Sequence, residues 1–134
     1  MIRTRALLVV VAVALLACGD DDEGATEADL LGVGAECVAS HECLQQGDGG
    51  INLACLDQFK GGYCGLEDCA GNDDCPDRSV CVAHDDGHNY CFRSCVDKSE
   101  CNVNRTEGNE ANCSSNVEFV DEDTPGKACV PPSD

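Results

Sequence analysis

Cysteine spacing constrains this chain more than any other feature. Thirteen of the 134 residues are cysteine, and twelve of them form three groups of four, each opening with the spacing C-x5-C. The groups are Cys37, Cys43, Cys55 and Cys64; Cys69, Cys75, Cys81 and Cys91; and Cys95, Cys101, Cys113 and Cys129. The residue before the second cysteine is acidic in every group: Glu42, Asp74 and Glu100. This pattern predicts three tandem four-cysteine modules.

Such a cysteine density predicts a small disulfide-rich fold with short β-hairpins and little regular secondary structure. Cysteine above about 8–10% in a short exported chain is typical of a disulfide scaffold. The chain after residue 17 has only five aromatic residues, and none of them is tryptophan. We therefore expect cross-links to replace most of the missing core. The modules are expected at residues 36–66, 67–92 and 93–130, followed by a tail at 131–134.

The third and fourth cysteines of each module are predicted to lie on a β-hairpin. Asp85-Asp86-Gly87 contains a strong turn signal between two strand-like runs. The paired strands of the three modules are expected at residues 53–57 and 62–66, 79–84 and 88–93, and 116–121 and 127–130. Each C-x5-C segment is expected to be a loop or a single helical turn, with its acid near an N-terminal amide.

Zinc is the main alternative to disulfides for these cysteines. A structural zinc site usually has a tight C-x2–4-C pair, whereas the close pairs here, Cys64/Cys69 and Cys91/Cys95, cross module boundaries. Exported cysteines are normally oxidised, which favours disulfides. Four cysteines allow three connectivities. Bonding of the first to the third and the second to the fourth is favoured because it ties each loop across its hairpin, but spacing alone does not decide between the three.

Residues 1–17 have the organisation of an export signal. Arg3 and Arg5 precede an apolar run of twelve residues, which is too short to span a bilayer. The run ends in Leu15-Leu16-Ala17-Cys18, which resembles the lipobox of bacterial lipoproteins. The resemblance implies that residues 1–17 are removed and that Cys18 is lipidated. Twelve cysteines then remain, an even number that can pair completely.

Charge restricts the partners of the processed chain. Without residues 1–17 it has six basic residues and 26 acidic ones, a formal net charge of −20. This composition argues against nucleic acid, which needs clustered Lys and Arg, and against contact with anionic lipid, so the N-terminal lipid is the only membrane contact expected. Residues 18–35 comprise the lipidated cysteine and a stretch with six acids and no base. They are expected to be a flexible acidic tether.

The repeat C-x4-[DE]-C, followed by two further cysteines, resembles the tandem cysteine-rich repeats of exported lipoproteins from myxobacteria and their relatives. It also resembles, more loosely, Dickkopf-type cysteine-rich modules. The resemblance covers roughly residues 36–130, and it implies an architecture but no activity. The expected location is the cell envelope outside the cytoplasm, with the outer membrane or cell surface favoured.

The function expected from these features is that of a lipid-anchored binding or structural module with a protein or polysaccharide partner. One alternative is a small inhibitor of secreted proteases that uses the loop Gln45–Ile51 as its reactive site. Another is a calcium-dependent adhesion module. Tyr63, Tyr90 and Phe92 would either form a contact face, because aromatic residues dominate binding hot spots, or fill the small module cores, which is favoured.

No catalytic residue, metal ligand or cofactor is predicted, and an enzyme is not expected. The sequence contains no G-x-S-x-G or H-E-x-x-H motif and no EF-hand loop. His84 and His88 are four residues apart, and on a helix both would face one transition metal. The Asp-Gly turn between them favours two solvated histidines beside a hairpin instead.

Overall fold

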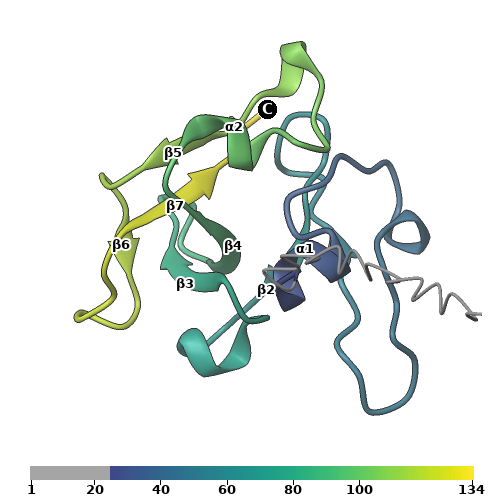
Figure 1. Cartoon of the computed structure of the whole chain (residues 1–134), viewed down its shortest axis with the longest axis horizontal. Helices are drawn as coiled ribbons and strands as arrows, with labels where there is room; N and C mark the ends of the chain where they lie inside the picture. The colour runs from purple at the N-terminus through teal and green to yellow at the C-terminus, as the bar shows by residue number, and fades with distance from the viewer. Residues whose placement is uncertain (1–24) are drawn as a thin grey trace, which may run out of the picture.

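The structure, a computed structural model, describes residues 25–134, which fold around one antiparallel sheet (Figure 1). The strands are β1 (Ala54–Cys55), β2 (Cys64–Glu67), β3 (Ser79–Ala83), β4 (Asn89–Cys95), β5 (Asn112–Ser114), β6 (Glu118–Phe119) and β7 (Lys127–Val130). The helices are α1 (Glu27–Leu31), α2 (Lys98–Cys101) and the 3-10 turns η1 (Ser40–Glu42), η2 (Asn72–Asp74) and η3 (Glu107–Asn109). The predicted disulfide-rich class with little regular structure is confirmed. Within the described range, no helix is long and apolar enough to cross a membrane.

Six disulfides join the twelve cysteines of the three modules. In each module the first cysteine bonds the third and the second bonds the fourth, which is the connectivity favoured from the sequence. The bonds are Cys37–Cys55, Cys43–Cys64, Cys69–Cys81, Cys75–Cys91, Cys95–Cys113 and Cys101–Cys129. The Cα atoms of the bonded cysteines lie 5.3 to 6.0 Å apart, which is ordinary disulfide geometry.

The third and fourth cysteines are direct cross-strand neighbours in every module. The facing pairs are Cys55 and Cys64, Cys81 and Cys91, and Cys113 and Cys129. Neither cysteine of a facing pair bonds the other. Each instead bonds one end of the preceding C-x5-C segment, so two parallel links hold that segment across the hairpin.

The acid before the second cysteine closes each C-x5-C segment as expected. Glu42 accepts a hydrogen bond of 2.6 Å from the amide of Val38, and Asp74 accepts one of 2.7 Å from the amide of Ala70. In the third module Glu100 accepts from the amide of Val96 at 2.5 Å. Each carboxylate thus accepts from the amide just before the N-cap residue, and Glu42 and Glu100 also accept from the N-cap amide itself.

Two of the three predicted hairpins are confirmed, and the third is wrong. β1 pairs with β2, and β3 pairs with β4. In the last module β7 pairs with β5, whereas β6 lies on the free edge of β3. The turn signal at Thr124-Pro125-Gly126 suggested a local hairpin. The register that places Cys113 opposite Cys129 instead turns residues 115–126 into a long connection.

Strand β4 joins the modules into one sheet. It begins in the second module and ends at Cys95, the first cysteine of the third. It pairs with β3 along one edge and with β2 and β7 along the other. The linker between the second and third modules therefore lies inside a strand. Each disulfide joins two cysteines of the same expected module, whereas strand pairing crosses both boundaries between modules.

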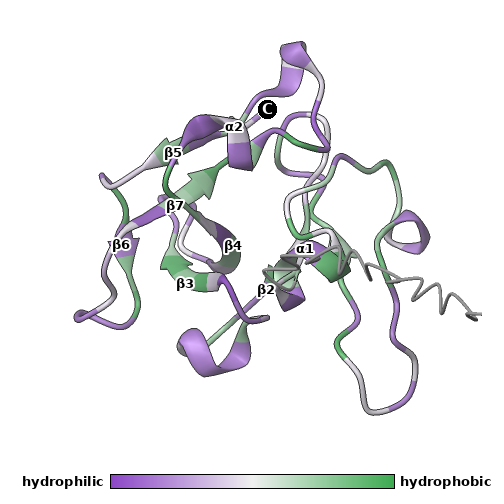
Figure 2. Cartoon of the chain, in the orientation of Figure 1, coloured by the Kyte–Doolittle hydropathy of each residue, from purple (hydrophilic) through white to green (hydrophobic). Residues whose placement is uncertain are grey.

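One aromatic core joins the first two modules, and Ala128 of the third module packs against it. Phe59, Tyr63, Tyr90 and Phe92 are almost fully buried, and their ring centroids lie 5.1 to 6.2 Å apart, mostly edge to face. Such contacts add to the free energy gained by burial. Figure 2 shows the apolar stretches along β3, β4 and β7, while the connecting turns are polar. The expectation that Tyr63, Tyr90 and Phe92 fill separate module cores is therefore wrong, although the third module keeps a small cluster of its own around its disulfides.

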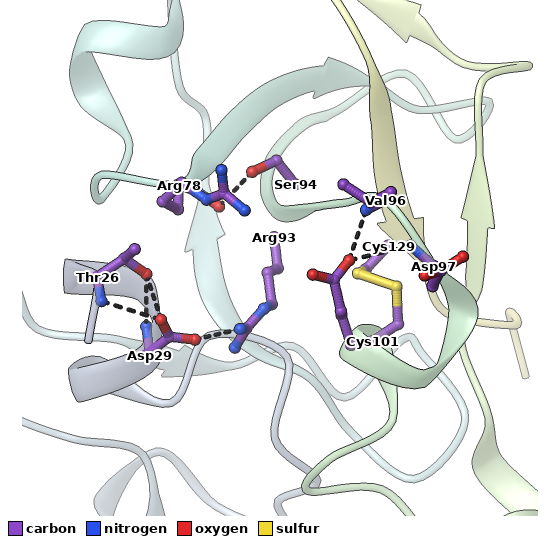
Figure 3. Close-up of polar contacts among 10 residues, drawn as sticks. Thr26, Asp29, Arg78, Arg93, Ser94, Val96, Asp97, Cys101 and Cys129 are labelled. Carbon is purple, nitrogen blue, oxygen red and sulfur yellow. Dashed lines mark hydrogen bonds and ion pairs between the residues drawn. A yellow bond between two sulfur atoms is a disulfide. The ribbon is translucent and has the colours of Figure 1, made fainter. Parts of the chain in front are cut away.

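The expected tether is shorter than predicted, because residues from Thr26 onward are folded. Thr26 caps α1, and Asp29 accepts a hydrogen bond from the Thr26 amide in return. Ala28 and Leu31 lie on the buried face of the helix. Asp29 also forms an ion pair with Arg93 of β4 (Figure 3). The many acidic residues of this segment predicted a tether, although part of it forms a short amphipathic helix. Residues 18–24 of the expected tether lie outside the described range.

Arg105 connects the third module to the first. Its buried guanidinium donates to the carbonyl oxygens of Lys60 at 2.8 Å, Gly62 at 2.9 Å and Gly34 at 3.1 Å. Gly62 has a φ of +68°, and a Cβ atom there would lie 2.1 Å from the carbonyl oxygen of Cys37. The site therefore requires glycine. Sequence patterns did not single out either residue.

The two tyrosines provide a test of this shared core, since they are the only ones in the chain and tryptophan is absent. Burial raises the pKa of Tyr63 to about 12. Burial also raises the pKa of Tyr90 to about 12. Asp86 contributes further to this rise, and its carboxylate accepts a hydrogen bond from the Tyr90 hydroxyl, with 2.8 Å between the oxygen atoms. Native protein thus holds these protons more tightly than unfolded protein. The resulting stability is complete below about pH 10 and is lost as the pH rises toward 12.

We predict that absorbance at 295 nm will show almost no tyrosinate at about pH 10.5 in the oxidised protein. The reduced and denatured chain should be more than half ionised at about that pH. Rapid-mixing measurements avoid alkaline damage to the disulfides. A native titration midpoint close to pH 10 for either tyrosine would contradict the buried aromatic core.

Candidate binding surface

The residues singled out from the sequence fall into three places. Cys18 lies outside the described range. The other twelve cysteines are all disulfide-bonded, so no thiol in the described range is free to act as a nucleophile. Tyr63, Tyr90 and Phe92 lie in the core, which rules them out as a contact face.

The two hairpin histidines have different surroundings. His84 is largely buried and packs edge to face against Phe59, with ring centroids 5.3 Å apart. Its Nδ1 atom lies 3.3 Å from Asp86. His88 is exposed and directs its Nδ1 atom toward Glu67 at 3.2 Å. The two histidines flank the turn as predicted, but the expectation that both are solvated is wrong for His84, because its ring packs into the edge of the aromatic core.

The loop Gln45–Ile51 is exposed but folded back on itself. Gln45 and Asn52 form an isolated β-bridge, and the side chain of Asn52 accepts from the Gly47 amide at 3.1 Å. The amide of Ile51 donates to the side chain of Gln46 at 3.0 Å. Figure 1 shows this loop extending away from the sheet. Internal hydrogen bonds occupy the amides of Gln46, Gly47, Gly50 and Ile51.

A groove of about 380 Å³ lies between α1 and the C-x5-C segment of the first module. Its size falls within the usual range for ligand pockets, about 300–1,000 Å³. Leu30 and Leu31 line the helix side, whereas His41, Glu42 and Leu44 line the module side. The Cys43–Cys64 disulfide contributes to its wall. Leu30 is 68% exposed and Leu44 46% exposed, so apolar side chains remain open to a partner.

Two fixed negative charges flank this groove. Hydrogen bonds from the Val38 and Ala39 amides hold the pKa of Glu42 below its usual range. Hydrogen bonds from Thr26, with Arg93 nearby, lower the pKa of Asp29 in the same way. Both carboxylates are therefore ionised at neutral pH. Because their partners are parts of the same rigid scaffold, the charges keep fixed positions beside the apolar rim.

Sequence reasoning missed this groove because half of it belongs to the segment expected to be a tether. The signal that could have found it is the pattern Thr26-x-x-Asp29 followed by Leu30 and Leu31, a capping sequence before apolar residues.

No protein-family model, no curated protein and no solved structure matches this chain.

Proposed function

We propose that this chain is a lipid-anchored cell-envelope protein that binds a basic, partly apolar segment of a protein partner. The groove between α1 and the first module carries this proposal. Its leucines offer apolar contact to one side chain, and Glu42, which forms no ion pair with the described residues, favours a neighbouring cation. The acidic surface of the whole molecule attracts the same kind of partner over longer distances.

The scaffold supports a binding role because both walls of the groove are held in place. The Cys37–Cys55 and Cys43–Cys64 disulfides fix the module wall. The capping hydrogen bonds of Thr26 and the ion pair between Asp29 and Arg93 fix the helix wall (Figure 3). A surface that is already ordered loses little conformational entropy on binding.

The groove favours this role over that of a protease inhibitor. A substrate-like inhibitor loop needs free backbone groups that pair with the enzyme as an added strand. In the loop Gln45–Ile51 the bonds within the loop occupy the amides of Gly47 and Ile51. Gly47 and Gly49 have φ angles of +78° and +83°, which bend the loop away from an extended conformation.

The binding proposal can be tested with labelled peptides that contain one leucine between two lysines. Fluorescence anisotropy should show about tenfold tighter binding of this peptide than of a matched peptide with glutamates in place of the lysines. Leu30→Ser and Leu44→Ser should each weaken binding about fivefold, because each removes roughly 1 kcal/mol of apolar contact.

Val103→Ser is the matched control. Val103 is 72% exposed, close to the value for Leu30, and does not line the groove. It should leave the affinity unchanged. Equal binding of the lysine and glutamate peptides, or an equal loss in the control, would rule out the groove as the binding site.

The anchor is tested separately. Protein from the membrane fraction should have an intact mass that begins at an acylated Cys18, and it should enter the detergent phase on Triton X-114 partitioning. Cys18→Ser should enter the aqueous phase with its six disulfides intact. An unmodified N-terminus in membrane-derived protein, or detergent partitioning of the variant, would refute lipidation at Cys18.

A further inference from the structure

Three potential metal ligands meet on the surface where the first two modules join. Glu67 ends β2, Asp68 follows it, and His88 precedes β4. One ligand atom from each side chain lies within 4.8 Å of the other two. The remaining clusters of this kind in residues 25–134 consist of disulfide-bonded cysteines, which are not available to a metal. This site is distinct from the groove.

The distances fit the first coordination shell of a transition metal. The Nδ1 atom of His88 lies 3.2 Å from a Glu67 carboxylate oxygen and 3.6 Å from one of Asp68. A tetrahedral zinc ion with bonds of about 2.0–2.1 Å separates its ligand atoms by roughly 3.3–3.4 Å. Small rotations of exposed side chains would bring all three atoms onto one ion.

The backbone beneath these ligands is fixed by several bonds. The Asp68 amide donates to the carbonyl of Asn89 at 2.8 Å, and the Asn89 side chain donates to the carbonyl of Cys69 at 3.0 Å. The His88 amide donates to Asp86 at 3.0 Å. The Cys69–Cys81 disulfide lies directly beside this segment. The three ligands are therefore presented by a rigid frame, which favours metal binding.

The negative charges of Glu67 and Asp68 also favour a bound cation. Within the described residues, His88 is the only basic side chain within 4.0 Å of either carboxylate. Two neighbouring carboxylates repel each other, and a bound divalent ion relieves such repulsion. The mixture of one imidazole and two carboxylates suits zinc and related transition metals better than calcium or magnesium, which prefer oxygen ligands alone.

We propose that Glu67, Asp68 and His88 bind one divalent transition-metal ion, with zinc as the probe of choice. His88 supplies Nδ1, and each carboxylate supplies one oxygen. The fourth position of a tetrahedral ion stays open to water or to a ligand atom from a partner. The ion links the end of β2 to the β3–β4 hairpin.

The test uses the full oxidised protein in detergent, freed of metal by a chelator. Isothermal titration with zinc chloride should show one equivalent bound, whereas calcium and magnesium chloride should bind at least tenfold more weakly. His88→Ala and Glu67→Gln should each weaken zinc binding about tenfold or more. Glu122→Gln is the control, because Glu122 is exposed and belongs to none of the ligand clusters, and it should leave the affinity unchanged.

A second measurement needs no variant. The chain has three histidines, and 15N-edited NMR of their rings should show a zinc-dependent shift at His88 and none at His41 or His84. The proposal is overturned if zinc does not bind, if His88→Ala binds it as tightly as the unaltered protein, or if the shift appears at another histidine. Thiol titration of the denatured protein, expected to detect no thiol, excludes binding by reduced cysteine.

Discussion

Each module of this protein places two cysteines opposite one another on paired strands and bonds both to the segment that precedes them. This double link fixes the C-x5-C segment, whose acid then closes a single helical turn. The strands that carry the fourth cysteines continue directly into the next module, as β2 and β4 show. Neighbouring modules therefore share hydrogen bonds, and the whole described chain forms one sheet.

The small number of apolar residues suffices because they are concentrated. Four of the five aromatic residues after the N-terminal run meet in one cluster. α1 covers part of this core with Ala28 and Leu31, and Arg105 holds the third module against the first. Disulfides restrict the unfolded chain, while the shared core gives the folded chain its unique arrangement. The groove and the metal-ligand cluster both lie on surfaces that this arrangement makes rigid.

The parts predicted from the sequence were those set by local spacing. Cysteine periodicity revealed the modules, Asp86-Gly87 revealed the β3–β4 hairpin, and the recurrent acid revealed the closed turns. Contacts between distant residues were not predicted. Arg105 reaches carbonyls more than 40 residues away, and β6 leaves its own module to pair with β3. Nothing in the local sequence indicates these partners. The acidic composition of residues 18–35 predicted a tether where α1 forms.

The hydrogen bonds and packing between the modules predict that all three fold as one cooperative unit. Native-state hydrogen exchange on the oxidised protein tests it most directly, because amides that open only by global unfolding share one free energy of exchange. The slowest amides of β2, β3, β4 and β7, which come from all three modules, should exchange with the same free energy and the same denaturant dependence. Three separate values, one for each module, would show that the modules open independently and would contradict the shared core.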